Sequence, residues 1–155
     1  MNNGKRFEEN FRKSVPKDVF YYRFKDGTAS WDGAKTRFQH YNVCDCMIFS
    51  QGRLYLLELK STQGKSLPLS RIRQNQLREL TETLVFENIV AGLIINFSDT
   101  EDTFFLHIEK LVNFIKRDER KSIPLVYLEE HGIRIENKRL KINYKYKVEK
   151  FLREV

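Results

Sequence analysis

The sequence predicts an α/β fold in which a mixed central sheet is flanked by helices. Two apolar runs, residues 53–60 and 89–97, lie in the middle of the chain, and continuous apolar character over so few residues is typical of strands buried on both faces. Segments with apolar residues at helical spacing precede, separate and follow these runs, at 6–13, 70–87 and 109–117. This alternation favours layers of helix and sheet over a bundle or a barrel.

Composition sets the size of the fold and the kind of partner. The chain has 155 residues, of which 41% are hydrophobic, including twelve Phe and seven Tyr; this is enough for one domain with its own core, so we expect residues 1–155 to form a single domain. The net charge of +7 and the pI near 9.4 favour a polyanionic partner, because clustered Lys and Arg displace counterions from nucleic acid. Many basic proteins bind no nucleic acid, so charge alone does not decide.

Neither a membrane span nor a disulfide is expected. No apolar stretch approaches the roughly 20 residues of a spanning helix, and the polar start of the sequence lacks the apolar centre of a signal peptide. We therefore expect a cytoplasmic protein without a membrane partner. Cys44 and Cys46 are two residues apart, which disfavours a disulfide, and without other nearby ligands they make a poor zinc site. They should be small core residues on the strand face opposite Asp45.

The first elements follow from local spacing. Phe7 and Phe11 are four residues apart, so residues 6–13 predict a short helix that should end at Val15 and Pro16. The β-forming run 19–24 predicts the first strand.

Residues 25–41 contain no sustained period, and a loop of this length is often functional. Lys35 and Arg37 make it a candidate DNA-contacting segment. It could equally be a surface loop that holds Trp31 and Phe38 in the core.

The remaining elements alternate in type. Ser70 is expected to cap a helix that runs to about residue 87. Its apolar face would comprise Ile72, Leu77, Leu80, Leu84 and Val85. Residues 89–97 and 103–108 predict two strands and 109–117 a helix. The tail should contain a short helix ended by Gly132, β-like segments within 133–146, and a terminal helix through Phe151 and Leu152.

The candidate catalytic residues lie where two predicted strands meet. Glu58 and Lys60 end the run 53–60, and residues two apart on a strand point to the same face. Asp45 stands thirteen residues before Glu58, and Ser50-Gln51-Gly52 is a plausible hairpin turn between the two segments. The hairpin would bring two carboxylates and a lysine together, a set that suits Mg²⁺, which takes one or two protein carboxylates together with water and phosphate oxygens.

A simpler interpretation also fits these three residues. They could form a solvent-facing row with a cross-strand salt bridge. The apolar positions before Glu58 argue instead for burial, and a buried charge needs a partner or a metal. A buried ion pair would satisfy that requirement as well.

Further short motifs accompany the cluster: Gly4-Lys5-Arg6-Phe7-Glu8-Glu9, Lys65-Ser66-Leu67-Pro68-Leu69 and Gln76. Together with Asp45 and Glu58-Leu59-Lys60, they resemble the RecU family of Holliday junction resolvases, especially its compact bacteriophage versions, within the PD-(D/E)xK nuclease superfamily. The resemblance runs in order from the first helix to the region of Asn96.

The resemblance implies a restriction-endonuclease-like fold, dependence on Mg²⁺ with Mn²⁺ as a substitute, and a homodimer that cuts a four-way junction symmetrically during DNA recombination and repair. If the chain is phage-encoded, it would act in the host cytoplasm. The resemblance also implies five roles: Asp45 and Glu58 as metal ligands, Lys60 as the catalytic lysine, Glu8 as an acidic helper and Gln76 as a polar helper. Glu8 is preferred to Glu9 because it has the family's Gly-x-x-x-Glu spacing from Gly4. A plain helix-surface carboxylate remains the alternative for Glu8.

The function implied is hydrolysis of DNA phosphodiesters at branched junctions. Five cations would hold the flanking phosphates: Lys35, Arg37, Lys65, Arg71 and Arg73. Larger cellular members carry a long β-stalk where this chain has only residues 25–41, so junctions would be discriminated weakly or by other residues. The alternatives are a nicking or structure-nonspecific endonuclease of the same fold, and a non-catalytic DNA-binding module.

Overall fold

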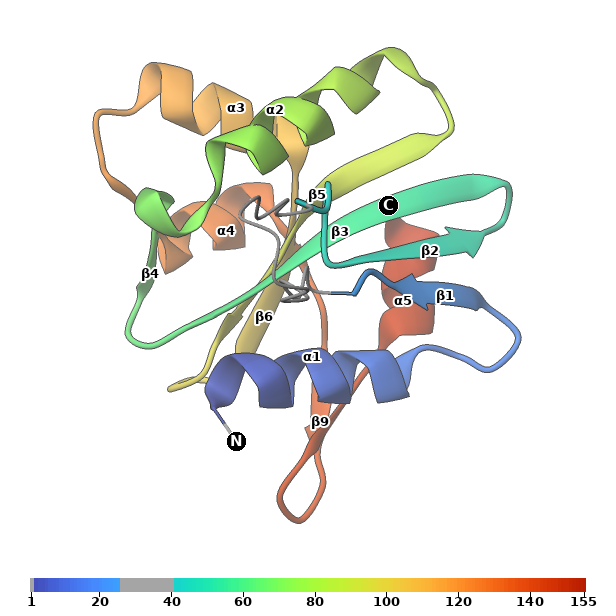
Figure 1. The fold of residues 1–155 in the computed structure, drawn as a ribbon. Coiled ribbons are helices and arrows are strands. Elements are labelled where there is room, and N and C mark those ends of the chain that lie inside the picture. Colours follow the sequence, from blue (N-terminus) through green and yellow to red (C-terminus); the bar gives the residue numbers. More distant parts are fainter. Residues whose placement is uncertain (1, 26–40) are drawn as a thin grey trace, which may run out of the picture.

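The computed structural model describes residues 2–25 and 41–155 and has a six-stranded sheet at its centre (Figure 1). In spatial order the strands are β1 (Phe20–Arg23), β2 (Cys46–Ser50), β3 (Arg53–Thr62), β5 (Ile89–Phe97), β6 (Asp102–His107) and β8 (Ile133–Arg134). β3 and β5 are parallel, whereas the other neighbours are antiparallel. The mixed sheet predicted from the sequence is confirmed.

Helices cover both faces of this sheet (Figure 1). They are α1 (Asn3–Ser14), α2 (Gln74–Glu82), α3 (Ile108–Arg117), α4 (Leu125–His131) and α5 (Val148–Glu154), with short 3-10 turns η1 (Leu69–Arg71) and η2 (Thr83–Val85) beside α2. One core cluster holds Phe7 of α1 and Phe151 of α5, and a second holds Leu80 of α2, Leu111 of α3 and Leu128 of α4. Among the described residues, no helix is long and apolar enough to cross a membrane.

Two small ribbons complete the structure. β4 (Ser66–Pro68) pairs antiparallel with β7 (Ser122–Pro124), and β9 (Asn137–Arg139) pairs antiparallel with β10 (Tyr144–Tyr146). The connection between β9 and β10 projects away from the body of the molecule (Figure 1).

The first helix and the hairpin after it follow the sequence closely. Asn2 caps α1 by accepting a hydrogen bond from the backbone N–H of Lys5 at 2.8 Å, so the helix begins three residues earlier than predicted. The β2–β3 turn has two central residues, Gln51 and Gly52, with φ of 52° and 76°. Positive φ at both positions is typical of the turn that joins tightly paired antiparallel strands, so the predicted hairpin is confirmed.

The predicted helix from Ser70 to about residue 87 is wrong in its extent. The backbone at Ile72 is extended (φ −99°, ψ 118°), and α2 begins only at Gln74. The reason is tertiary packing, because the Ile72 side chain is buried in the core and so holds the chain out of the helix. The predicted apolar face fails at its end, since Leu84 and Val85 are exposed.

The two cysteines are both buried and free, as expected. They do not share a strand face, however. Cys46 belongs to the cluster under α1 and α5, whereas Cys44 belongs to the cluster under α2 and α3. Cys44 precedes β2, so the strict alternation assumed from the sequence does not extend to it.

Gly92 permits close packing in the middle of β5. A Cβ atom at this position would lie 2.3 Å from the backbone oxygen of Leu106 and 2.6 Å from the ring of Phe105. We expect Gly92→Ala to lower the free energy of unfolding by about 2–4 kcal/mol, because backbone and a packed ring must both move. Urea unfolding measures this.

The matched control is Gly4→Ala in the first turn of α1. A Cβ atom there would approach only the Asn2 side chain, at 3.6 Å, and alanine favours helix. This variant should be neutral or slightly more stable than the wild type. Equal stability of the two alanine variants would contradict the packing argument.

Candidate active site

Glu58 and Lys60 lie side by side on β3, on the sheet face that α2 and α3 cover. The ammonium Nζ of Lys60 donates to Oε1 of Glu58 at 2.6 Å. Only 3% of the Glu58 side chain and 16% of the Lys60 side chain are exposed. Strand alternation therefore places the two residues together, as the sequence predicts, and the surface-row interpretation does not fit their burial.

Gln76 approaches the same carboxylate from α2. Its Nε2 donates to Oε2 of Glu58 at 3.0 Å, so each oxygen of Glu58 accepts a hydrogen bond from a side chain. Gln76 Oε1 is buried and has no hydrogen-bond partner within the part of the chain that the structure describes. A buried acceptor without a partner is rare, and beside a carboxylate it is a natural position for a cation or an ordered water.

Asp45 completes the cluster from the residue just before β2. Its backbone N–H donates to Leu57 at 3.2 Å, and its carbonyl accepts from Phe24 at 2.9 Å, so the backbone continues the sheet ladder. Its side-chain Oδ2 accepts from the backbone N–H of Leu59 at 2.7 Å. This hydrogen bond holds the carboxylate of Asp45 against β3 at Leu59, the residue between Glu58 and Lys60.

Negative charge accumulates around Asp45. Burial and the charge of Glu58 raise the pKa of Asp45 from 3.8 to about 7, a shift that Glu8 reinforces. The Leu59 N–H and the Lys60 ammonium oppose this shift. The site thus holds more negative charge than its single lysine neutralises, which favours the binding of a cation.

The donor set fits Mg²⁺ or Mn²⁺ but not a closed protein cage. No group of three or more His, Cys, Asp or Glu among residues 2–25 and 41–155 could hold a metal ion. The chain offers the carboxylates of Asp45 and Glu58 and the amide oxygen of Gln76, which has no hydrogen-bond partner among the described residues. Mg²⁺ usually keeps several waters and binds through one or two carboxylates together with phosphate oxygens, which matches this set.

Glu8 and Glu9 of α1 are in different environments. Glu8 Oε2 pairs with Nη2 of Arg23 on β1 at 3.0 Å and acts electrostatically on Asp45. Glu9 pairs with Arg12 at 2.9 Å and Lys13 at 3.1 Å on its own helix. The geometry therefore favours Glu8 over Glu9 as the carboxylate associated with the cluster.

Three of the predicted DNA-binding cations lie between the end of β3 and the start of α2. Lys65 is exposed. Nη1 of Arg71 donates to the carbonyl of Ser61 at 2.8 Å, next to Lys60. The guanidinium of Arg73 lies 5.9 Å from the centre of the Tyr41 ring. The other two predicted cations, Lys35 and Arg37, lie outside the described residues.

Sequence reasoning missed two contributors to this site. One is Arg23, which binds Glu8, and the other is the backbone N–H of Leu59, which holds Asp45. For Arg23, the one indication in the sequence was its position near the end of the β-forming run 19–24. The second depends on where β2 begins relative to β3, which the sequence does not specify.

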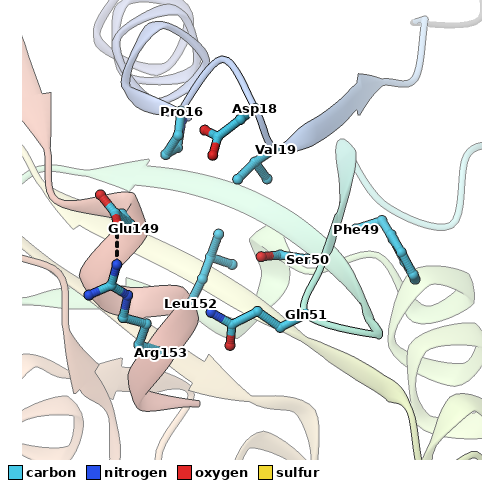
Figure 2. Close-up of a pocket in the computed structure, with 9 residues that line it drawn as sticks. All are labelled: Pro16, Asp18, Val19, Phe49, Ser50, Gln51, Glu149, Leu152 and Arg153. Atoms are coloured by element: carbon cyan, nitrogen blue, oxygen red, sulfur yellow. Dashed lines mark hydrogen bonds and ion pairs between the residues drawn. The ribbon is translucent and has the colours of Figure 1, made fainter.

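A hollow of about 460 Å³ lies between the α1–β1 connection, the β2–β3 turn and α5 (Figure 2). It is lined by Pro16, Asp18, Val19, Phe49, Ser50, Gln51, Glu149, Leu152 and Arg153. The predicted catalytic residues all lie in the described part of the chain, and none of them lines this hollow. The acidic cluster is therefore separate from it.

Comparison with known proteins gives consistent similarities. The family model "Recombination protein U" (RecU) matches residues 9–150. A SPbeta prophage-derived uncharacterized protein, YotM of Bacillus subtilis, is 31% identical over 99% of this chain and 87% of its own length. The Holliday junction resolvase RecU of Streptococcus sanguinis is 30% identical over 66% of this chain and 52% of its own length, so the chain spans about half of that resolvase.

A solved structure supports the fold. The Holliday junction resolvase Hjc of Archaeoglobus fulgidus superposes with a TM-score of 0.50 and 12% sequence identity, over 75% of this chain and 82% of that one. At this identity the likeness concerns the fold alone. It agrees with the restriction-endonuclease-like architecture expected for the mixed sheet.

Proposed function

The chain belongs to the Recombination protein U (RecU) family, and from this membership we propose that it is a metal-dependent endonuclease that resolves four-way DNA junctions by symmetric phosphodiester hydrolysis. The observation that carries the proposal is the cluster on β3. Two carboxylates, a lysine and a buried glutamine from three separate segments meet at one place. We further propose that residues 1–155 act as one nuclease domain, on branched DNA in the cytoplasm.

Asp45, Glu58 and the amide oxygen of Gln76 would hold the metal. When bound, Mg²⁺ or Mn²⁺ supplies a Lewis acid for the scissile phosphate and makes a coordinated water more acidic. The other contributions come from the chain itself. The Lys60 ammonium is placed to offset the negative charge that develops on the phosphate. The Leu59 N–H and Gln76 fix the orientation of the two carboxylates.

Flanking phosphates would be held by cations beside this cluster. Lys65 follows β3, Arg71 and Arg73 lie farther along the chain, before α2, and Arg71 is anchored to the β3 backbone at Ser61. Such contacts position the duplex without reading its sequence. We propose the same role for Lys35 and Arg37 and assign Glu8, through its pair with Arg23, to positioning at the rim of the site.

We also propose that the active form is a homodimer. Six exposed apolar residues form what we call the apolar edge surface: Phe20, Tyr22, Phe49, Leu84, Val85 and Phe86. The exposed fraction of each residue lies between 42% and 79%. Phe20 is paired with Phe49, and Phe49 with Leu54, so these side chains share one face of the sheet. Leu84 and Val85 belong to η2, and Phe86 follows it; η2 lies just before β5, the strand next to β3.

The size of the apolar edge surface suits a second copy of the chain. These side chains present roughly 500 Å², if a fully exposed aromatic side chain offers about 200 Å². This is at the upper end for the largest apolar patch of a monomer, and with a polar rim it approaches the roughly 800 Å² that each partner buries in a stable interface. A two-fold dimer would also match the symmetry of a junction cut in two strands.

The dimer proposal predicts that Val85→Glu combined with Phe86→Glu weakens self-association at least 100-fold, because two charges would be buried against an apolar partner. Analytical ultracentrifugation over a concentration series measures this. Val126→Glu is the control, since Val126 of α4 is 53% exposed and lies outside the apolar edge surface. An unchanged dimer in the double variant would place the interface elsewhere.

The proposed activity is tested with a labelled four-way junction and a linear duplex of the same sequence, each with Mg²⁺ and with EDTA. We expect paired symmetric nicks in the junction that require the metal. Equal cutting of both substrates would leave a structure-nonspecific endonuclease. Binding without cutting, in Mg²⁺ and in Mn²⁺, would leave a DNA-binding module.

A further inference from the structure

The β9–β10 hairpin is a second cationic feature, outside the proposed catalytic cluster. Its exposed residues include the cations Lys138, Arg139, Lys141 and Lys145. Within residues 2–25 and 41–155, none of these four forms an ion pair with a carboxylate. The neighbouring Glu136 is already paired with Lys147 and Lys150. The hairpin therefore presents positive charge that the described part of the chain does not neutralise.

The pairing of the two strands makes this charge unfavourable for the isolated protein. Lys138 and Lys145 are direct partners in the antiparallel register. Like charges opposite each other destabilise a β-ribbon, and a two-stranded ribbon is marginal by itself. An anionic partner at this place would remove the repulsion.

The tip of the hairpin adds exposed aliphatic surface. Leu140 is 47% exposed and Ile142 is 78% exposed. They flank Lys141 in a tight connection, in which the Leu140 N–H donates to the carbonyl of Asn143 at 2.7 Å. The tip thus combines cations for phosphates with apolar side chains that find no cover in the described part of the protein.

The base of the hairpin is held firmly against α1. Tyr146 is buried and contacts Phe7, with ring centres 5.5 Å apart, and its backbone N–H donates to Oγ of Ser14 at 2.9 Å. At the other strand, Nδ2 of Asn137 donates to the carbonyl of Glu101 at 2.7 Å. The base of the hairpin therefore has a fixed position relative to α1, the helix that carries Glu8.

We propose that the β9–β10 hairpin is a DNA-contacting element that binds at the branch point of the junction. Lys138, Lys141 and Lys145 contact phosphates of the converging strands, and Leu140 and Ile142 pack against bases exposed where stacking is interrupted, as apolar wedges do at kinked base steps. The inference rests on the proposed function. The hairpin would then contribute to the discrimination of junctions from duplex DNA.

Two double variants separate the two parts of this contact. Leu140→Ser with Ile142→Ser removes the apolar tip, and Lys138→Gln with Lys145→Gln removes the facing charges. The matched charge control is Lys110→Gln with Lys116→Gln on α3, which lies far from the hairpin (Figure 1). All six positions are exposed, so each variant should fold, and thermal unfolding verifies this.

The measurement is fluorescence anisotropy with labelled junction and duplex in EDTA, over a series of salt concentrations. In the tip variant, the ratio of junction affinity to duplex affinity should fall at least tenfold, while the duplex affinity itself changes less than twofold. The charge variant should bind the junction more weakly. The slope of its log affinity against log salt concentration should fall by the amount that corresponds to about two phosphate contacts. The α3 control should retain both properties.

Two results would overturn the inference, and they are distinguishable. If the wild type prefers and cuts the junction, and both hairpin variants behave like the α3 control, the hairpin has no role while the proposed function stands. If the wild type neither prefers nor cuts the junction, the proposed function fails and the hairpin assignment fails with it.

Discussion

Asp45→Asn should reduce junction cleavage at least about 1000-fold while leaving junction binding measurable. The substitution removes one of the two carboxylates proposed as metal ligands, and metal-assisted stabilisation of a phosphoryl transition state contributes several kcal/mol; about 4 kcal/mol corresponds to this factor. The asparagine oxygen can still accept from the Leu59 N–H, so the local fold should persist. Single-turnover cleavage and anisotropy on the same junction measure the two properties.

The same variant has a stability signature that separates a charge effect from a loss of fold. Because the pKa of Asp45 is raised from 3.8 to about 7, the folded state resists ionisation of this carboxyl. The carboxyl therefore lowers the stability of the wild type as pH rises from about 4 to about 7, and the deficit persists above pH 7. The asparagine side chain of the variant does not titrate in this range.

In EDTA, Asp45→Asn should thus be more stable than the wild type at pH 8, by on the order of 1–3 kcal/mol, and the gain should vanish near pH 4. Urea unfolding at the two pH values measures it. Asp18→Asn, at an exposed carboxylate outside the cluster, should change neither cleavage nor this pH dependence. Survival of full activity in Asp45→Asn would show that the proposed site is wrong.

Lys60→Met should impair both stability and catalysis. Glu58 would keep its hydrogen bond from Gln76 but lose the cation that pairs with it within the described part of the chain, the Lys60 ammonium at 2.6 Å. Removing one member of a buried ion pair typically costs about 3–5 kcal/mol. We expect a loss of about 2–4 kcal/mol in unfolding free energy and of at least about 100-fold in cleavage rate, since a charge facing the phosphate is also lost.

Two further variants distinguish the structural role of Lys60 from the catalytic one. Lys60→Met combined with Glu58→Gln removes both charges, so it should recover part of the lost stability and yet stay inactive. Lys13→Met removes a surface partner of Glu9 and should change stability by less than about 0.5 kcal/mol. Recovery of activity in the doubly neutral variant would contradict a catalytic role for this pair.

The parts of the fold that could be predicted are those set by short-range patterns. The run 89–97 became β5 with the same bounds, because its residues other than Gly92 and Asn96 are apolar and suit a strand buried on both faces. The side-by-side placement of Glu58 and Lys60 followed from strand alternation alone, and the hairpin turn at Gln51 and Gly52 brought Asp45 near them.

What could not be predicted depends on long-range docking. The start of α2 is set by the burial of Ile72, which requires the rest of the core. The pair between Glu8 and Arg23 joins a helix and an edge strand fifteen residues apart, and no local period specifies their contact. Gln76 came from family resemblance, because its contact with Glu58 depends on how α2 crosses the sheet.

The bond from the Leu59 amide to the Asp45 carboxylate gives the site a built-in spectroscopic probe. The Asp45 carbonyl accepts from the N–H of Phe24, so the acceptor for the Leu59 N–H is the titrating side chain of Asp45 rather than its backbone. The amide proton of Leu59 should therefore shift in an NMR titration with the protonation of Asp45. Its hydrogen-exchange rate would report how tightly the start of β2 is held against β3 at each pH.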